Sequence, residues 1–384
     1  MMTARETHQP NVLLYLGKFP GYGFDVDGGS ILARQLIDSL KYHCNLTLVF
    51  IRKNGEIYTD LMVQQIKYVE YKNPYGNKFE RRMQNLDTNR QAIGVFDQYD
   101  IIVTAHISKF FGFENAPQSF WDKTVLFPMF CTSSYKRSGE IVPSEYTKLE
   151  HFVLNHVKKI ITPSIIESYD LQQDYGVDEK KISIVYRGIN PVFTYSSETN
   201  NWNSPRIVSI GSIKKQKNNL SSLLVLNHLL ESGLDVTLDC IGTIQDKELY
   251  EMMLSYIKSN QLTQKVAFHF EQTQEQVAKV VKSADINIST SNWETFGRGI
   301  FEGISCGLPT FVFSRLTSVQ KICEGNTGVV FVENEEEMAK AIINVMNSPS
   351  TYYQMKDSLK TLAERVSYDR ERKDLIKQIL NKDV

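Results

Sequence analysis

Two glutamates eight residues apart, Glu294 and Glu302, are the side chains of this sequence best placed to do chemistry. An apolar segment that we expect to be a strand, Asp285–Thr290, precedes them, and a helix is expected to start near Gly297. Glu294 would then lie in the loop at the carboxyl end of a strand, and Glu302 in the second helical turn. Ligands of open α/β sheets bind at that edge, so both carboxylates could accept hydrogen bonds from ligand hydroxyls.

The backbone between the two glutamates offers a second kind of binding group. The N–H groups of Thr295, Phe296 and Gly297 would lie at a helix N-terminus, which attracts phosphate. With one carboxylate on a sugar and the other on both hydroxyls of a ribose, this segment could hold all three parts of a nucleotide sugar. An ordinary strand–loop–helix with surface glutamates is the alternative, because glutamate pairs at this spacing are common by chance.

The same segment resembles the E-x7-E signature of retaining GT-B glycosyltransferases, particularly glycosyltransferase family four. Glu294 and Glu302 match its two glutamates, and Gly307-Leu308-Pro309 matches the Gly-x-Pro that usually follows. The resemblance covers nearly the whole chain; it is strongest over residues 207–332 and weakest over residues 55–96. It implies an α/β protein with the GT-B fold, in which two Rossmann-like, doubly wound domains face each other across a cleft.

The alternation of short apolar segments with helical patterns along the 384 residues fits this organisation. We expect strands at residues 11–16, 46–51, 101–104, 125–127, 159–161, 183–185, 206–210, 235–241, 265–270, 285–290, 310–313 and 329–332. We expect an acceptor-binding N-terminal domain over residues 1–195, a polar linker over 196–204 and a nucleotide-sugar-binding domain over 205–365. The C-terminal segment, residues 366–384, is expected to be a helix that packs back on the N-terminal domain.

The loop after the expected strand 206–210 contains the basic side chain that the resemblance places at the donor diphosphate. The family has Gly-Arg-Leu here and a lysine six residues after the glycine; Gly211 and Lys217 match the glycine and that lysine. The resemblance implies that Lys217 neutralises the donor diphosphate as it departs, when its negative charge grows. The family arginine is replaced by Ser212, so Lys214, Lys215 or Arg298 would have to substitute, although solvated charges are the more common role for these three.

Two further glycine positions match the family. Gly28 and Gly29 follow the first expected strand, at the place of a glycine pair that faces the donor diphosphate, and glycines let a backbone approach a phosphate closely. Gly188 lies in a segment that resembles the family's domain-closing sequence and is expected to line the cleft, whereas Phe193 in the same segment is expected to pack. Asp25 and Asp27 formally fit a D-x-D metal motif, but we expect a polar loop or acceptor contact there and no metal site.

His106 follows the expected strand 101–104, at a place where the family commonly has a histidine near the donor sugar. Its implied role is to hydrogen-bond a sugar hydroxyl or to position the acceptor, while a structural histidine is the alternative. The nearby aromatic residues of 109–113 and 120–121 could stack on sugar faces, bind an apolar acceptor or form core, which is the default for aromatics. Residues 67–82 mix tyrosines with lysines and arginines; they could touch an anionic lipid surface or a polymer, although a solvated insertion is the more ordinary interpretation.

The composition limits the partners and the cellular compartment that we expect for this protein. Lys+Arg 43 against Asp+Glu 44 gives a net charge of -1, so no global field favours nucleic acid as a partner. The five scattered cysteines fit reduced thiols, the N-terminus has no signal-peptide pattern, and no apolar run is long enough to span a bilayer. We therefore expect a cytoplasmic protein that could contact the inner face of the membrane peripherally.

These observations and the resemblance predict a retaining, metal-independent glycosyltransferase of the hexosyl or N-acetylhexosaminyl type, acting in carbohydrate biosynthesis. The donor would be a nucleotide diphosphate sugar, with UDP as the expected carrier, and the acceptor a carbohydrate, lipid-linked or protein hydroxyl. No separate cofactor is expected, and a partner subunit is left open. Two rivals remain: a glycosyltransferase-like accessory subunit, which Ser212 favours, and another GT-B reaction such as epimerisation or inverting transfer, for which only His106 is a candidate base.

Overall fold

A computed structural model describes residues 9–16, 28–52, 65–70, 76–129, 131–137, 139–196 and 204–383. The chain forms two compact units. The first comprises Met1–Val185 together with Arg372–Val384, and the second comprises Tyr186–Glu371. The expected linker, residues 196–204, follows a stretch of ten residues, 186–195, that the contacts assign to the second unit.

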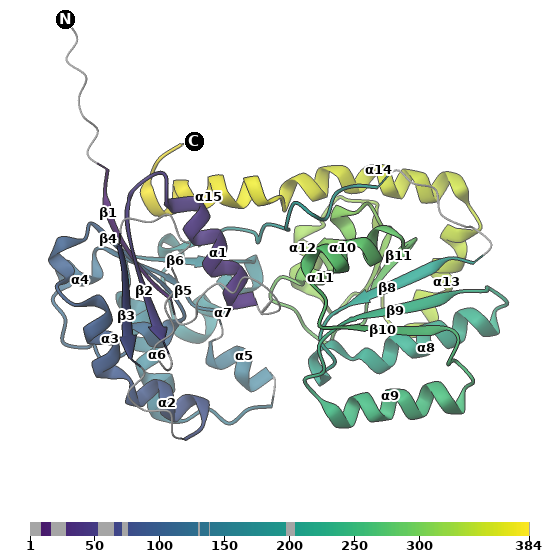
Figure 1. Cartoon of the computed structure of the whole chain (residues 1–384), viewed down its shortest axis with the longest axis horizontal. Helices are drawn as coiled ribbons and strands as arrows, with labels where there is room; N and C mark the ends of the chain where they lie inside the picture. The colour runs from purple at the N-terminus through teal and green to yellow at the C-terminus, as the bar shows by residue number, and fades with distance from the viewer. Residues whose placement is uncertain are drawn as a thin grey trace, which may run out of the picture. The chain divides into compact units, whose positions relative to one another are not determined.

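The first unit is built on a parallel sheet whose strands follow the order β3-β2-β1-β4-β5-β6-β7 (Figure 1). The strands are β1 (Asn11–Leu16), β2 (Asn45–Arg52), β3 (Gln65–Glu70), β4 (Ile101–Ala105), β5 (Thr124–Phe127), β6 (Lys159–Thr162) and β7 (Ile182–Ile184). The helices are α1 (Gly28–Leu40), α2 (Lys78–Gln84), α3 (Leu86–Ile93), α4 (Gln118–Trp121), α5 (Thr132–Arg137), α6 (Ser144–His156) and α7 (Ile165–Tyr175), with 3-10 turns η1 (Phe96–Gln98), η2 (Ile107–Phe110) and η3 (Glu179–Lys181).

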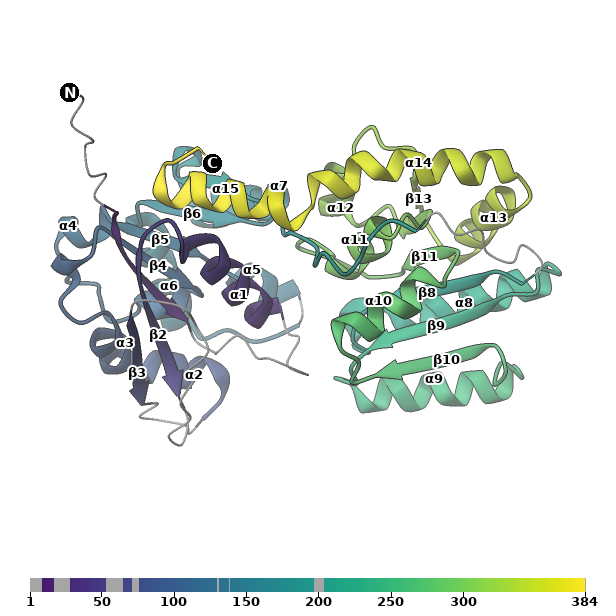
Figure 2. The same ribbon diagram turned by 45° about the horizontal axis from the view of Figure 1, so that its top comes forward.

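Both faces of this sheet are buried, which explains why its strands are apolar at consecutive positions. Val12 and Leu14 of β1 pack in a cluster with the apolar face of α1, and Leu13 and Tyr15 pack in a second cluster on the other side of the strand. The last helix, α15 (Tyr368–Leu380), contributes Leu375, Ile376, Ile379 and Leu380 to the α1 cluster. Figure 2 shows α15 running beside β6, where the Lys159 ammonium donates to the Gln378 carbonyl at 2.8 Å.

The second unit has a parallel sheet with the order β10-β9-β8-β11-β12-β13 (Figure 2). Its strands are β8 (Arg206–Ile210), β9 (Thr237–Gly242), β10 (Val266–Phe270), β11 (Ile286–Ser289), β12 (Thr310–Phe313) and β13 (Val329–Val332). Its helices are α8 (Asn219–Glu231), α9 (Lys247–Ser259), α10 (Gln274–Lys282), α11 (Arg298–Ser305), α12 (Thr317–Ile322), α13 (Glu335–Met346) and α14 (Pro349–Arg365), with the 3-10 turn η4 (Lys215–Lys217).

The second sheet is also covered on both faces. Residues of α8, α9 and α13 pack with Ile207 and Leu238, while residues of α10, α11, α12 and α14 pack with Val208 and Val312. In both sheets the strand order reverses direction next to the first strand of the unit, β1 or β8, which is the arrangement of a doubly wound sheet. The expected fold class is therefore confirmed, as two α/β units with parallel sheets.

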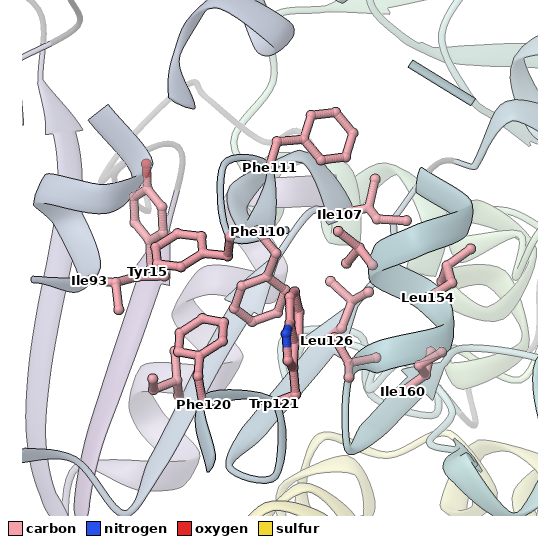
Figure 3. Close-up of a cluster of buried hydrophobic side chains, with 14 of the residues drawn as sticks. Tyr15, Ile93, Ile107, Phe110, Phe111, Phe120, Trp121, Leu126, Leu154 and Ile160 are labelled. Carbon is pink, nitrogen blue, oxygen red and sulfur yellow. The ribbon is translucent and has the colours of Figure 1, made fainter. Parts of the chain in front are cut away.

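The structure corrects one expectation in the first unit and agrees with another. Residues 67–82 are not simply a solvated insertion, because residues 65–70 form the edge strand β3, which pairs in parallel with β2, and Phe79 of α2 is buried. The aromatic residues after His106 follow the default interpretation: Phe110, Phe111, Phe120 and Trp121 are core residues, and Figure 3 shows Phe110, Phe120 and Trp121 gathered in one cluster. No helix in the described part of the chain combines the length and hydrophobicity needed to cross a membrane.

Candidate functional site

Glu294 lies in the loop between β11 and α11, as the sequence pattern predicts. Its carboxylate is nearly buried and is held on one oxygen: the Lys217 Nζ lies 2.5 Å from Oε1, and the Ser291 hydroxyl donates to the same oxygen at 2.7 Å. Ser318 donates to the Glu294 main-chain carbonyl at 2.6 Å. No hydrogen bond or ion pair among the described residues uses Oε2, so the Glu294 carboxylate is held through one oxygen.

Lys217 ends the short turn η4, in the loop that follows β8. Its aliphatic stem passes over Gly211, where a Cβ atom would lie 3.2 Å from the Lys217 Cδ, so a glycine suits this position. The loop is tied to the Glu294 loop by two hydrogen bonds: the Gln216 side chain donates to the Trp293 carbonyl at 2.9 Å, and the Asn292 N–H donates to the Gln216 carbonyl at 2.8 Å. The two loops therefore position Lys217 and Glu294 as one unit.

The three basic residues considered as substitutes for the family arginine lie in different environments. Lys214 is partly buried; burial lowers its pKa, the Lys217 charge lowers it further and the Glu294 charge opposes both. Lys215 is exposed. Ser212 itself hydrogen-bonds with the Thr243 hydroxyl at 3.0 Å. The charges of Lys217 and Glu294 thus both act on Lys214.

Glu302 lies in the second turn of α11, also as expected, and is 5% exposed. Burial raises the pKa of its carboxyl, and the positive charges of Arg298 and Lys217 oppose that rise. Arg298 is one helical turn away; it donates through Nη1 to the Gly188 carbonyl at 3.2 Å. Arg298, the third of these basic residues, therefore hydrogen-bonds Gly188 and partly compensates the charge of Glu302. It acts at a different place from Lys214.

Gly188 is held on both sides of its backbone. Its N–H donates to Glu371 Oε2 at 2.7 Å, and its carbonyl accepts from Arg298. A Cβ atom at this position would lie 2.7 Å from the Tyr368 Cα, so only glycine fits. Arg187, the neighbouring residue, places its Nη1 3.6 Å from Glu371 Oε1. Phe193 is a core residue, in agreement with the expected packing role.

Two glycines that the sequence analysis did not single out bring α11 close to the sheet. A Cβ atom on Gly299 would lie 2.4 Å from the Ile210 carbonyl oxygen of β8, and one on Gly303 would lie 2.4 Å from Asn287 Cγ of β11. Close helix–strand packing through glycine is also how dinucleotide-binding folds bring a helix N-terminus to a ligand. The glycine spacing within α11 was the sequence signal that could have identified these positions.

The N-terminus of α11 begins at Arg298, with Gly297 as its cap at φ 86. Within the described residues, no hydrogen bond uses the N–H groups of Thr295, Phe296 or Gly297, so all three are available to an anion. The Phe296 ring stacks on Phe301 at 4.6 Å between centroids, in the core, so only its main chain can serve a ligand.

His106, in the first unit, caps the turn η2. Its Nδ1 accepts from the Ser108 N–H at 3.2 Å, so the neutral ring carries its proton on Nε2. Burial holds the pKa of His106 well below its ordinary value, and the charges of Arg82, Lys109 and Lys78 lower it further. A neutral ring of this tautomer offers a ligand an N–H donor.

Gly28 and Gly29 form the first turn of α1 rather than the loop before it. Asp25 and Asp27, the pair that formally fits a metal motif, lie outside the described residues. The five cysteines are all buried as free thiols.

Comparison with known proteins agrees with this architecture. Residues 195–361 match the family model described as "Glycosyl transferases group 1". Among solved structures, sucrose-phosphate synthase from Thermosynechococcus elongatus superposes with a TM-score of 0.79 at 15% identity, over 97% of this chain and 100% of that one. A glycosyltransferase from Rickettsia africae gives 0.71 at 18% identity, over 98% and 100%. No curated protein matches the sequence.

A third structure is informative because of what it contains. HepE from Anabaena, in a complex with UDP and glucose, superposes with a TM-score of 0.73 at 13% identity, over 98% of this chain and 100% of that one. At these identities the likeness shows the fold, which is the GT-B fold. The family match lies within the second unit and agrees with that fold.

Proposed function

We propose that this protein is a retaining glycosyltransferase of family four that transfers a hexosyl or N-acetylhexosaminyl group from a UDP-linked donor to a hydroxyl acceptor. The observation that carries the proposal is the joint placement of Lys217 and Glu294, fixed at 2.5 Å in the loops at the carboxyl ends of β8 and β11. That edge of a doubly wound sheet is where nucleotides bind.

In this proposal each group has one task. The α11 N-terminus binds the diphosphate through the N–H groups of Thr295, Phe296 and Gly297. Lys217 uses one of its three N–H donors on Glu294 and keeps the others for phosphate. The free oxygen of Glu294 accepts from a donor-sugar hydroxyl, and the Glu302 carboxylate accepts from both ribose hydroxyls.

Lys214 is proposed as the second cation of the diphosphate site, in place of the family arginine at Ser212. It is partly buried, and the charges of Lys217 and Glu294 shift its pKa. Lys215 is exposed, and Arg298 donates a hydrogen bond to the Gly188 carbonyl. Gly211 and Gly242 pack backbone against backbone here, since a Cβ on Gly242 would lie 2.3 Å from the Gly211 carbonyl oxygen. This tight packing holds the loop close to the sheet, so that phosphate can approach the loop backbone.

The chemical step follows from these roles. The bond between the sugar C1 and the leaving phosphate oxygen breaks, and the acceptor oxygen bonds to C1 on the same face. The acceptor proton passes to the leaving phosphate oxygen, so no protein carboxylate need act as nucleophile and no metal is required. Lys217, Lys214 and the helix N-terminus stabilise the charge that grows on the phosphate. His106 positions the acceptor through its Nε2–H, and Gly28 and Gly29 allow a close backbone approach to the donor.

The test is binding and turnover with a panel of nucleotides. UDP, GDP, ADP and TDP and their sugar conjugates are titrated against the wild-type protein and Glu302→Ala, followed by analysis of the anomeric configuration of the product with and without a chelator. We expect UDP to stabilise the wild type and not the variant, and the product to keep the donor configuration. An inverted product would overturn retention; no response to any nucleotide would favour the accessory-subunit alternative that Ser212 suggests.

A further inference from the structure

Four basic side chains of the first unit lie within one another's electric field. They are Lys78 and Arg82 of α2, His106 before η2 and Lys109 within it, and we call them the basic cluster. Burial is the largest cause that lowers the pKa of His106, and the charges of Arg82, Lys109 and Lys78 lower it further. Burial and then the Arg82 charge lower the pKa of Lys109 to about 7. The neighbouring positive charges therefore disfavour the protonated forms of His106 and Lys109.

Aromatic side chains hold these cations in fixed positions. The Tyr135 ring is shared: Lys78 Nζ lies 4.3 Å from its centroid and the Arg82 Cζ lies 5.8 Å from it. Arg82 Nη1 also donates to the Tyr135 hydroxyl at 2.8 Å and the Tyr146 hydroxyl at 3.4 Å. Lys109 Nζ lies 4.8 Å from the centroid of the Tyr15 ring. Hydroxyls and ring faces orient a cation without neutralising it.

Carboxylates compensate only part of this charge. Lys78 forms an ion pair with Glu140. Glu150 attracts Arg82 from further away, but its Oε2 already accepts from the Thr132 N–H at 2.9 Å and the Tyr175 hydroxyl at 2.7 Å, and burial raises its pKa. Within the described residues, Arg82 and Lys109 form no ion pair with a carboxylate. Counted over the part of the chain that the structure describes, the cluster therefore keeps an excess of positive charge.

His106 adds an unused donor to the cluster. Its Nε2 is buried and has no hydrogen-bond partner among the described residues, although its Nδ1 is occupied by Ser108. A buried donor without an acceptor costs free energy. His106 also has a φ of 123, a conformation that non-glycine residues seldom adopt and that is often retained at ligand sites.

We propose that the basic cluster binds an anionic group, a phosphate or a carboxylate, on the sugar acceptor. Arg82 and Lys109 supply charge and donors, and the Nε2–H of His106 supplies a further hydrogen bond. This inference rests on the proposed function, because it assigns a chemical class to the acceptor of that reaction. The cations are partly buried and individually oriented, so they suit one compact anion better than the flat, mobile charges of a lipid surface.

The test uses inorganic phosphate as the probe, with the full-length protein saturated with UDP so that the donor phosphate site is occupied. Phosphate affinity is measured by calorimetry for the wild type, Arg82→Gln and Lys109→Met; Arg90→Gln, an exposed α3 arginine paired with Asp87, is the control. We expect Arg82→Gln and Lys109→Met each to weaken phosphate binding about tenfold, the effect of one charged hydrogen bond, and Arg90→Gln to change nothing. Equal affinities in Arg82→Gln and Arg90→Gln, or no phosphate binding by the wild type, would overturn the proposal.

A second comparison identifies the anion. Glucose, glucose 6-phosphate and glucuronate are titrated under the same conditions, and vesicles of phosphatidylglycerol are tested by sedimentation. Tighter binding of either charged sugar than of glucose supports the site, and the tighter of the two names the group. Vesicle binding that Arg82→Gln abolishes, without any preference for a charged sugar, would replace the proposal with a membrane contact. UDP binding is recorded in every variant, so a failure of donor binding is distinguished from a failure of this site.

Discussion

The ammonium nitrogen of Lys217 lies 2.5 Å from Oε1 of Glu294, although 77 residues separate them in sequence. Both side chains are mostly buried, and their short contact holds each of them in place. In the proposed reaction this pair joins the group that binds the leaving phosphate to the group that binds the donor sugar.

We predict that Glu294→Gln and Lys217→Met lower turnover and that their effects are not additive. Either change breaks the same ion pair, so the double variant should lose less than the product of the two single losses. Each single variant should lower kcat by about tenfold or more, with a smaller change in UDP affinity for Glu294→Gln. The measurement is steady-state kinetics combined with UDP titration; strictly multiplicative losses would show that the two residues act independently.

Removing the second glutamate should have a different signature. Glu302→Ala is expected to weaken UDP binding by about tenfold, because it removes the acceptor proposed for both ribose hydroxyls. A titration with UDP and with 2′-deoxy-UDP checks this: the variant should no longer distinguish the two ligands. Glu275→Gln, at an exposed position of α10, is the control and should behave as the wild type.

The buried environment of Glu302 also predicts a pH dependence. Its folded pKa is raised above 4.5, so the carboxyl takes up a proton at a higher pH than an exposed glutamate does. Protonation removes the charge of the carboxylate and turns one of its oxygens into a donor, so it should bind the ribose hydroxyls more weakly. UDP affinity should therefore fall as the pH drops from 7 through that raised pKa. Affinity measured against pH in the wild type and in Glu302→Gln tests this, because the variant lacks the titrating group; identical profiles would contradict the prediction.

The sequence predicted the parts of the fold that depend on local pattern. The strands at 11–16, 206–210, 310–313 and 329–332 have the predicted bounds, because consecutive apolar residues buried on both faces leave a strong signal. The sequence did not predict the edge strand β3, because an edge strand needs fewer apolar residues and the polar residues of Gln65–Glu70 resemble a loop.

The candidate site was predictable where residues lie close together in sequence. Glu294 and Glu302 share one strand–loop–helix, so their places followed from it. The contact of Gly188 with Glu371, 183 residues apart, had no local pattern to reveal it. The same holds for the packing of Tyr135 beside Lys78 and Arg82, which depends on how distant helices meet.

The close approach of α11 to the sheet should be sensitive to a single methyl group. In Gly299→Ala the new Cβ would lie 2.4 Å from the Ile210 carbonyl oxygen, so the N-terminal turn of α11 has to move away from β8. We expect a lower melting temperature and weaker UDP binding, since the N–H groups of that turn are the proposed phosphate ligands. Thermal unfolding with and without UDP measures both effects. An unchanged stabilisation by UDP would show that the phosphate is bound elsewhere.

Glu371 should stabilise the second unit through the backbone of Gly188. Its Oε2 accepts the Gly188 N–H at 2.7 Å, and Arg187 lies 3.6 Å from its other oxygen. In Glu371→Ala the buried N–H loses its acceptor, which costs about 1–3 kcal/mol. Glu371→Gln keeps an acceptor oxygen and should lose less. Urea unfolding measures both, with Glu364→Ala, at an exposed position of α14, as the control. Equal losses in the alanine and glutamine variants would assign the stabilisation to the charge of Glu371 rather than to its hydrogen bond.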